Sequence, residues 1–547
     1  MNAAAMKKWL KEYGPYLAAV LAIALPWLAR PGYLFFTDMS WGPNLHYDWR
    51  DNSFLLKLAV RCLAVIFPVD LIEKSYISAA LLAVVLGGKR LAERFLEDKR
   101  LVFAVSLFAL FNPFVYDRMG YGQVGIVAAL GFLFLAVGDL LEYPDQGAGR
   151  AVRAGLWAGL AVQFSPHFVF FFGAFAALSL ALVLLGRDPR TLRRALGHFS
   201  FMALIIVALN LNWIAASFGE VGEVGRSISA GIQRQDLAAF QTSGASGADA
   251  LRNVLMLSGF WGKDQLRYLD LGAAMPGWGR GFLVLLPLII WGVVAGWRER
   301  RTRRLTAGLL AVFAGAVILA VGIRVPVASE LTYWLFDHLP LYKGMRETQK
   351  WTAVIAAVYA LFLALGARQL FRLKIIQANR SVSALFLAGV MIMQAPLLLF
   401  GLAGQVSPRP FPADWAEIDQ RLAGESRCQG SVLFLPWHMY MSFGWAGGII
   451  AAPAKEYFRC PVIQGTNMEW KGIYDNSGDP RSEAIQDWLS RRGATDLLRS
   501  GSLDIRYVLL AKEADWRIYS WLDGLTELRS VSETENLRLY EVIKTIE

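Results

Sequence analysis

The sequence has few charged residues and very few cysteines for its length. Only 18% of its 547 residues are charged, whereas 55% are hydrophobic, and the mean hydropathy is +0.39. This composition excludes a soluble globular protein, in which about a quarter of the residues carry charge. Three cysteines are too few for a disulfide scaffold. Two of them, Cys428 and Cys460, lie in the polar C-terminal part and could pair in an oxidising compartment.

Apolar runs of membrane-spanning length recur along the first 402 residues. A bilayer core needs roughly 20 residues of helix to cross it, so these runs predict an α-helical polytopic membrane protein with about 11 transmembrane helices. Lys7, Lys8 and Lys11 precede the first run, and no small-residue cleavage site follows it, which predicts an uncleaved first helix. The predicted spans are 13–29, 73–88, 101–115, 122–140, 153–165, 168–186, 198–216, 281–297, 305–322, 351–367 and 382–402.

The basic residues indicate which side of the membrane each loop faces. They concentrate in the short loops 89–100, 186–195, 298–304 and 367–380, and such loops face the cytoplasm. This predicts a protein of the inner membrane whose N-terminus lies in the cytoplasm. The long polar segments 30–72, 217–280, 323–350 and 403–547 lie outside. The formal net charge of +11 therefore comes from basic loops that orient the chain among membrane lipids. No nucleic-acid partner is predicted.

The chain divides in composition into a membrane domain at 1–402 and an extracytoplasmic α/β domain at 403–547. In the second, strand-like runs at 431–436, 505–510 and 537–542 alternate with helical patterns at 412–422 and 482–498. Within the first, the run Phe54–Val69 is interrupted by Lys57 and Arg61, and we expect an interfacial or re-entrant helix there rather than a full span.

The loop from Arg30 to Ser53 directly follows the first apolar run and concentrates polar groups at the expected bilayer surface. It holds His46 and the acids Asp38, Asp48 and Asp51 among aromatic residues, where charges are costly unless paired or used. Asp38, just beyond the helix, is placed to take a proton from an attacking hydroxyl. The alternative is a helix cap or an ion pair with a nearby arginine, and it applies more to Asp48 and Asp51.

Two shorter breaks between predicted spans carry further candidates. In the turn 112–123, Asp117 is expected to face outward, where it could bind a divalent metal through oxygen or pair with Arg118. In the break Gln163–His167, a proline frees backbone groups at membrane depth, which is tolerated only beside protein or a wet cavity. His167 is therefore expected to line a cavity, although a lone histidine is usually structural. Of the five histidines, only His198 falls on the cytoplasmic side.

The segment 339–351, before the tenth span, suits an anion. Arg346 and Lys350 lie one helical turn apart at an expected helix N-terminus, whose free N–H groups favour negative charge. Arginine grips phosphate with two hydrogen bonds, so a phosphate is the expected ligand. Alternatively, the two side chains extend to the interface, or Glu347 neutralises one of them.

These features together resemble the GT-C superfamily of polytopic glycosyltransferases, which use polyprenyl-phosphate-linked sugars. The resemblance rests on the acidic first loop with Asp38, the apolar run behind it, the acidic turn with Asp117, and the outer domain after the last span. The stretches FTDMSW, NPFVYDRMGYGQ and MRETQKW also look like those of uncharacterised membrane proteins near the YfhO-like members. The chain departs from the pattern in lacking an adjacent acidic pair in the first loop and a second acid beside Asp117.

The resemblance implies an inverting hexosyl or pentosyl transferase. Asp38 would be the general base and Arg346 and Lys350 would hold the donor phosphate, stabilising the leaving charge. The acceptor would be an envelope glycan, lipid or protein on the outer face, and any cofactor a divalent cation, Mg or Mn, at Asp117. The remaining substrate-binding candidates are His46, Asp48, Gln163 and His167, and Trp437, His438 and Trp470 suit sugar stacking if they are not core residues.

Two other functions fit the same outline. A transporter or flippase of lipid-linked saccharides would also need many helices and a basic outer cavity, but it favours polar residues at the bilayer midplane in both halves. A non-enzymatic envelope scaffold would not need the acids of the first loop. The clustering of charged groups on one face favours the transferase over the transporter, but Asn210 and Asn212 near the outer end of the seventh span keep the transporter as an alternative.

Overall fold

The structure is a computed structural model that describes residues 3–46, 49–50, 52–186, 189–218, 232–339, 342–424, 428, 430–470, 473–475 and 480–543. Contacts divide the chain into two compact units. The first comprises residues 1–26, 75–214 and 240–405, and the second comprises 27–74, 215–239 and 406–547. The boundary at 405 lies close to the end of the predicted membrane domain, whereas the first outer loop belongs by its contacts to the second unit.

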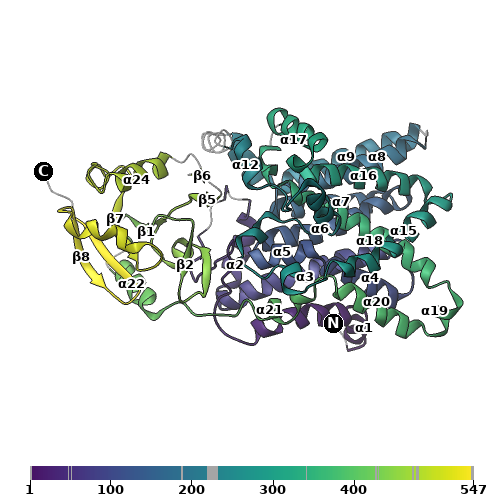
Figure 1. Cartoon of the computed structure of the whole chain (residues 1–547), viewed down its shortest axis with the longest axis horizontal. Helices are drawn as coiled ribbons and strands as arrows, with labels where there is room; N and C mark the ends of the chain where they lie inside the picture. The colour runs from purple at the N-terminus through teal and green to yellow at the C-terminus, as the bar shows by residue number, and fades with distance from the viewer. Residues whose placement is uncertain are drawn as a thin grey trace. The chain divides into compact units, whose positions relative to one another are not determined.

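The first unit is a bundle of helices (Figure 1). Five helices in the described ranges are long and apolar enough to cross a membrane, or up to seven if two bent pairs are counted. Each of the predicted spans overlaps a helix, and the chain is an integral membrane protein. The helices lying wholly or mainly in this unit are α1 (Ala3–Leu28), α3 (Val69–Ala92), α4 (Lys99–Leu110), α5 (Pro113–Tyr121), α6 (Val124–Gln146), α7 (Ala148–Phe164), α8 (Phe168–Leu184), α9 (Pro189–Leu209), α10 (Leu211–Phe218), α13 (Gly247–Leu255), η1 (Trp261–Gln265), α14 (Leu271–Ala274), α15 (Arg280–Arg298), α16 (Arg303–Val321), η2 (Gly322–Arg324), α17 (Pro326–His338), η3 (Tyr342–Arg346), η4 (Thr348–Trp351), α18 (Thr352–Leu370), α19 (Lys374–Ala378), α20 (Arg380–Ile392), η5 (Pro396–Leu398) and α21 (Leu399–Ala403).

Helix α18 is a buried helix of this bundle. The span from Thr348 to Leu370 is 83% buried, whereas the span of α9 is only 11% buried. Glycines bring α15 and α18 close together: a Cβ atom on Gly292 would lie 2.0 Å from the Phe362 oxygen, and one on Gly366 would lie 2.1 Å from the Leu288 oxygen. Small residues at such crossings let helix backbones approach. The residues that precede α18 are therefore held by a rigidly packed helix.

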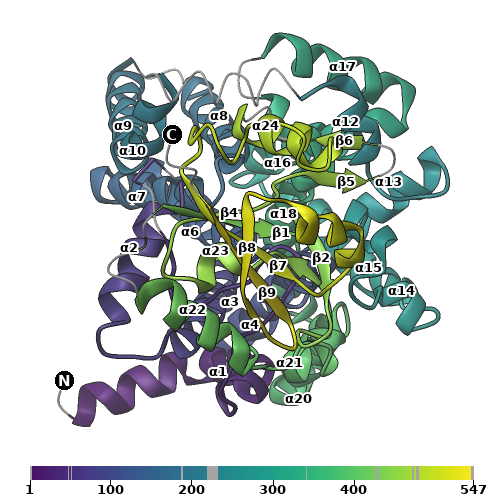
Figure 2. The ribbon, with the colours of Figure 1, turned by 90° about the vertical axis from the view of Figure 1, so that its left-hand side faces the viewer.

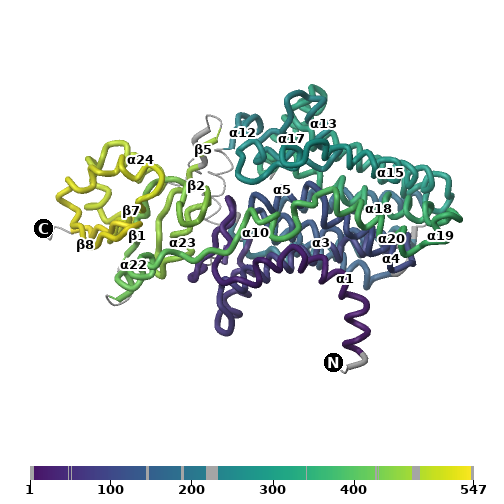
Figure 3. Tube along the Cα trace, turned by 60° about the horizontal axis from the view of Figure 1, so that its bottom comes forward, coloured from purple at the N-terminus to yellow at the C-terminus, as the bar shows by residue number. Residues whose placement is uncertain are grey.

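Helix α1 is bent, and Figure 3 shows its first part leaving the direction of the rest. Pro15 lies inside the helix. A proline removes one backbone hydrogen bond and clashes with the preceding turn, which bends a helix at that point.

The second unit is a small α/β domain built on one mixed sheet, whose strands Figure 2 shows side by side. The strand order is β4-β1-β7-β9-β8. Strands β4, β1 and β7 are parallel to one another, β9 is antiparallel to β7, and β8 is antiparallel to β9. The predicted strands are confirmed at β1 (Ser431–Leu435), β7 (Ile505–Ala511) and β9 (Leu537–Val542). Its other elements are α2 (Phe54–Leu63), α12 (Arg234–Ala239), α22 (Ala413–Gly424), β2 (Tyr440–Phe443), β3 (Gly448–Ala451), α23 (Ala454–Tyr457), β4 (Val462–Ile463), β5 (Met468–Trp470), β6 (Ile473–Asp475), α24 (Pro480–Ser490), η6 (Trp516–Gly524) and β8 (Leu528–Glu533).

Both faces of this sheet are covered by apolar side chains. Successive residues of β1 point to opposite faces, so Val432 and Phe434 enter one core with Trp415 of α22, while Leu433 and Leu435 enter another with Trp488 of α24. A disulfide joins Cys428 to Cys460, the pairing that the sequence left open. The predicted helix at 482–498 ends earlier, at Ser490, because the chain turns at Gly493, whose φ is +85°.

Candidate functional site

Three side chains at the start of α3 fix the first outer loop by its backbone. The Gly32 N–H donates to Asp70 at 3.0 Å and the Leu34 N–H donates to Glu73 at 3.0 Å. The Lys74 ammonium donates to the Arg30 carbonyl at 2.6 Å. Sequence reasoning missed this group, although two acids and a lysine at the start of an apolar helix were the available signal.

Further along, the same loop packs on the sheet domain. Phe35 enters the core beside Trp415, with its ring 5.0 Å from that of Trp445. The Thr37 carbonyl accepts from the Ala451 N–H at 2.9 Å, and the Ser40 hydroxyl donates to the Ala451 carbonyl at 2.9 Å. The aromatic residues of the loop are thus core anchors of the second unit.

These contacts place Asp38 beside the β2–β3 hairpin. Its Oδ1 accepts a 2.6 Å hydrogen bond from the Tyr440 hydroxyl, and its side chain stays partly exposed. A carboxylate that is oriented by a hydrogen bond and still reaches solvent can accept a proton from a substrate hydroxyl. His46 is held differently: its Nε2 lies 3.0 Å from the Phe458 carbonyl and so carries the hydrogen. Asp48 and Asp51 lie outside the described residues.

The candidates for sugar stacking in the outer domain differ in their surroundings. Trp437 is a buried core residue, and Trp470 donates its indole N–H to the Ala239 carbonyl at 3.2 Å. His438 lies between two carboxylates, with Nδ1 2.8 Å from Glu469 and Nε2 3.3 Å from Asp515. Burial lowers the pKa of His438, but the hydrogen bonds and charges of the two carboxylates outweigh it, and the net shift is upward.

This upward shift predicts a pH dependence of stability. A histidine whose pKa is raised on folding contributes stability below its unfolded pKa of about 6.5, and the contribution is lost as the pH rises through the folded value. We expect the free energy of unfolding of the full-length protein to fall by under about 1 kcal/mol at alkaline pH through loss of the His438 contribution. The effect is small because both carboxylates are solvent-exposed. Thermal unfolding followed against pH should show that this component disappears in His438→Gln. An unchanged pH slope in that variant would contradict the assignment.

In the first unit, Asp117 is buried on helix α5 and does not lie in an exposed turn. Asn112 caps α5 by accepting from the Val115 N–H at 3.2 Å, and Pro113 opens the helix. The sequence predicted a turn because Asn-Pro ends α4, but the same pair also begins a new helix, a role for which both residues are suited. Asp117 is 3% exposed and accepts from the Tyr268 hydroxyl at 3.0 Å.

The next residue, Arg118, joins a buried ion cluster. Its guanidinium donates to Glu347 at 2.9 Å, and Glu347 also pairs with Lys350 at 3.0 Å. Arg118 also bonds Gln123 and lies over the Phe260 ring, 4.1 Å from its centroid. Burial would raise the pKa of Glu347, but the charges of Lys350 and Arg118 hold it well below its usual range. Two cations share one carboxylate, which leaves the cluster positively charged.

Arg346 and Lys350 do not share a helical turn. Arg346 ends η3 and Lys350 lies in η4, and the backbone breaks between them at Glu347, with φ −88° and ψ 78°. Lys350 is buried and paired with Glu347, whereas Arg346 is half-buried with its guanidinium 4.6 Å from the centroid of the Phe240 ring. Of the two, Arg346 is the one whose side chain reaches a surface.

His167 is bonded through both ring nitrogens. Its Nε2 lies 2.8 Å from the Gly344 carbonyl and its Nδ1 lies 3.1 Å from the Ser165 hydroxyl. A carbonyl only accepts, so Nε2 carries the hydrogen and Nδ1 accepts. Burial, with Lys350 adding to it, lowers the pKa of His167 to about 3, which keeps the ring neutral. The imidazole thus ties the α7–α8 break, where Gln163 is buried, to the η3 turn.

A cavity of about 1180 Å³ opens beside α13, η1, α14 and the start of α15. The segment 258–270 separates it from α5: Lys263, Asp264 and Asp270 line the cavity, whereas Phe260 and Tyr268 contact Arg118 and Asp117. Among described residues, no carboxylate forms an ion pair with Lys263 or with Arg280 at the cavity wall. Three apolar side chains of α15, Phe282, Leu283 and Leu286, form another part of the wall, and Leu283 is exposed.

The surroundings of Asp117 do not form a metal site from protein side chains alone. Across the described ranges, no three His, Cys, Asp or Glu side chains come together in a way that could hold an ion, and the neighbour bonded to Asp117 is the Tyr268 phenol. The described donors around Asp117 do not fit a resident cation. Binding of Mg or Mn stays a prediction of the sequence.

The predicted site residues thus fall in two groups. Asp38 and His46 belong to the second unit, and Asp117, Gln163, His167, Arg346 and Lys350 belong to the first. Within the first unit, the segment 342–351 holds Arg346 and Lys350. His167 contacts this segment at Gly344, and Arg118 and Lys350 both pair with its Glu347. The expected alternative that Glu347 neutralises one of the two cations is confirmed for Lys350, whereas sequence reasoning missed the pairing of Arg118 with Glu347 and the cavity cations Lys263 and Arg280. The signal for the first pair was a charged residue at each break between apolar runs.

Comparisons with known proteins place this arrangement in a known fold. No protein-family model and no curated protein sequence matches the chain. Among solved structures, it is similar to the arabinofuranosyltransferase AftD from mycobacteria, with a TM-score of 0.59 at 14% identity, over 99% of this chain and 40% of AftD. ArnT from Cupriavidus metallidurans also aligns, at a TM-score of 0.40 and 12% identity over 98% of both chains. The chain therefore shares its fold with AftD and spans 40% of the length of AftD.

Proposed function

We propose that this protein is a glycosyltransferase that moves a sugar from a polyprenyl-phosphate-linked donor to an envelope glycan, lipid or protein acceptor on the outer face of the membrane. The observation that carries the proposal is the cavity beside α13 and α15, in a chain that shares its fold with AftD over 99% of its length. The cavity combines an apolar wall on α15 with two cations that lack ion-pair partners among the described residues.

The chemistry of that cavity suits a lipid phosphate. The apolar residues of α15 would contact the polyprenyl chain, and Lys263 and Arg280 would bind the phosphate through charge-assisted hydrogen bonds. The positive Arg118–Glu347–Lys350 cluster lies behind the same wall, and it would stabilise negative charge as the phosphate leaves the sugar. Arg346 remains a phosphate ligand by prediction, and Lys350 would act through Glu347 rather than by direct contact.

Asp38 is the proposed general base. It would take the proton from the acceptor hydroxyl as the oxygen attacks the anomeric carbon, the sugar–phosphate bond breaks, and the configuration inverts. The Tyr440 hydrogen bond orients the carboxylate through its Oδ1, and the partly exposed side chain is accessible to an acceptor from solvent. The extracytoplasmic position of the outer domain is part of the proposal, since it follows from the charge pattern of the loops.

The test is transfer by the purified full-length protein in nanodiscs, using a panel of radiolabelled polyprenyl-phosphate pentoses and hexoses. We expect label to pass to an acceptor fraction from cell envelope and free polyprenyl phosphate to appear. In Lys263→Gln/Arg280→Gln, the KM for the donor should rise by roughly 10- to 100-fold, because each lost charge-assisted bond weakens binding about tenfold.

Arg300→Gln/Arg301→Gln is the matched control, because both arginines are exposed in a loop predicted to be cytoplasmic. An equal rise in KM in the control would contradict phosphate binding in the cavity. Movement of intact lipid-linked sugar across the membrane of proteoliposomes that contain the protein, without bond cleavage, would instead support a flippase.

A further inference from the structure

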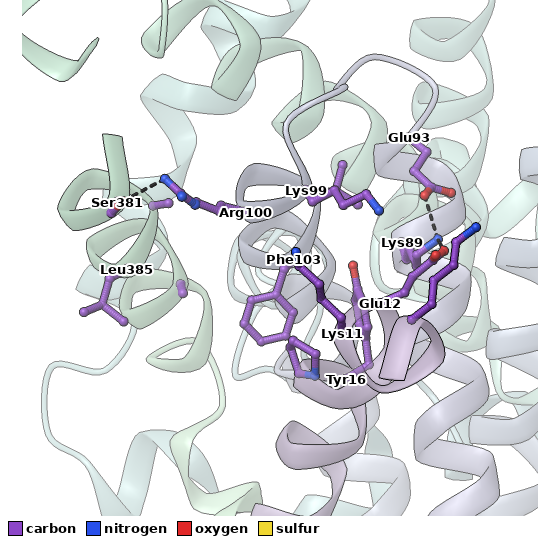
Figure 4. A pocket seen from close by; sticks show the side chains of 15 residues that line it. Lys11, Glu12, Tyr16, Lys89, Glu93, Lys99, Arg100, Phe103, Ser381 and Leu385 are labelled. Carbon is purple, nitrogen blue, oxygen red and sulfur yellow. Dashed lines mark hydrogen bonds and ion pairs between the residues drawn. The ribbon is translucent and has the colours of Figure 1, made fainter. Parts of the chain in front are cut away.

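A second cavity lies at the other end of the helices, away from the residues used above. It measures about 510 Å³ and is formed by α1, the end of α3, and the first turns of α4 and α20. The loops at this end, 89–100 and 367–380, are those that the charge pattern predicts to be cytoplasmic. Figure 4 shows the side chains that line it.

The cavity has an excess of positive charge. Five cationic side chains line it, from Lys8, Lys11, Lys89, Lys99 and Arg100, against the two carboxylates Glu12 and Glu93. Lys89 uses both carboxylates, at 2.6 Å from Glu93 and 3.7 Å from Glu12. Within the described part of the chain, the other four cations have no carboxylate within ion-pair distance. Their charge is therefore available to an anion.

Arg100 bridges two helices across the cavity. Its Nη1 donates to the Ser381 hydroxyl at 2.8 Å (Figure 4), which connects the first turn of α4 to the first turn of α20. A guanidinium has five N–H donors in a planar fork that matches two phosphate oxygens, and this bond uses one of them. The arginine is thus oriented before any ligand arrives.

The remaining walls are apolar and continue onto the outer surface of the bundle. Tyr16, Phe103, Ala384 and Leu385 line the cavity, and the neighbouring surface of α20 is strongly exposed, with Leu385 74% and Phe386 73% accessible. A soluble phosphate would gain nothing from contact with such an apolar surface, whereas the acyl chains of a lipid would be stabilised by burial against it. Charge and shape together select an occupant with an anionic head and an apolar tail.

We propose that this cavity binds the phosphate headgroup of an anionic membrane phospholipid, with its acyl chains lying against α20. Lys11, Lys99 and Arg100 contact the phosphate, and Leu385 and Phe386 contact the chains. Basic pockets between transmembrane helices on the cytoplasmic side hold lipid headgroups in this way. The inference does not depend on the proposed transferase activity, because it uses none of the residues assigned to donor or acceptor.

The test titrates phosphatidylglycerol and phosphatidylcholine separately into the detergent-purified full-length protein and counts bound lipids by native mass spectrometry. We expect phosphatidylglycerol to bind at least about tenfold more tightly, as each basic residue near an anionic headgroup adds to the attraction. Lys11→Gln/Lys99→Gln/Arg100→Gln should weaken phosphatidylglycerol binding roughly 10- to 100-fold and leave phosphatidylcholine binding unchanged.

The matched control is Arg194→Gln/Arg300→Gln/Arg301→Gln, which removes the same charge from other exposed positions, one on α9 and two in the turn between α15 and α16. An equal loss in this control would overturn the proposal, because it would mean that the overall positive surface binds the lipid. Equal affinity of the wild-type protein for both lipids would overturn it independently of any variant. Displacement of phosphatidylglycerol by equimolar glycerol phosphate would also overturn it, since the acyl chains would then contribute nothing.

Discussion

Replacing Asp38 with asparagine is expected to lower the rate of sugar transfer by roughly 10²- to 10⁴-fold, the usual contribution of a general base. The substitution keeps a carbonyl oxygen that can accept the Tyr440 hydrogen bond, so the loop should keep its position. It removes the ability to take a proton from the acceptor hydroxyl. Initial rates with saturating donor, in protein of unchanged elution and thermal stability, provide the measurement.

Two further variants separate catalysis from positioning. Tyr440→Phe removes the donor to Asp38 but keeps the carboxylate, and we expect a smaller loss of rate with a measurable residual activity. Asp48→Asn tests the neighbouring acid of the same loop, which the sequence ranks lower. Full activity in Asp38→Asn, or loss of activity only in Asp48→Asn, would show that Asp38 is not the base.

The second large effect concerns the buried ion cluster. In Glu347→Gln, Arg118 and Lys350 would remain buried as cations without their shared carboxylate. Removing one partner of a buried ion pair costs about 3–5 kcal/mol, because a charge is left in a medium of low polarity. We therefore expect a large drop in the thermal unfolding temperature of the purified protein and a low yield of folded protein in the membrane.

Glu299→Gln is the matched control for this prediction. Glu299 also pairs with an arginine, Arg368, but its side chain is 40% exposed, so its loss should cost under about 1 kcal/mol. The double variant Glu347→Gln/Lys350→Met removes a cation together with the carboxylate and should recover part of the stability. If Glu347→Gln and Glu299→Gln unfold at the same temperature, the cluster does not stabilise the fold.

Much of the fold could be predicted from periodicity and composition. Apolar runs predicted the positions of the helices, because bilayer thickness imposes a length that a sequence displays directly. The three strands β1, β7 and β9 were predicted because each is a run of β-branched, aromatic or leucine residues. Strand β4 was missed because it has only two residues, Val462 and Ile463, and their pairing with β1 depends on tertiary contacts.

The candidate site was less predictable than the fold. Loop acids were visible in the sequence, but whether a charge is paired depends on residues distant along the chain: Glu347 meets Arg118 across 229 positions. Asp117 was expected in a turn because the pattern showed where α4 ends and not that a second helix begins at once. Asp38 was assigned by a resemblance, and its contact with Tyr440, 402 positions away, could not be predicted from spacing.

The burial of α18 has a consequence for how the protein responds to its membrane. Lipid thickness and composition act on helices through the surface that is not covered by protein; the span that contains α18 is 83% buried, whereas the span of α9 is 11% buried. A thinner or thicker bilayer would tilt α9 first, while the glycine-packed α15–α18 pair would keep its register. The charged residues that precede α18 are therefore expected to keep their positions when the thickness of the surrounding bilayer changes.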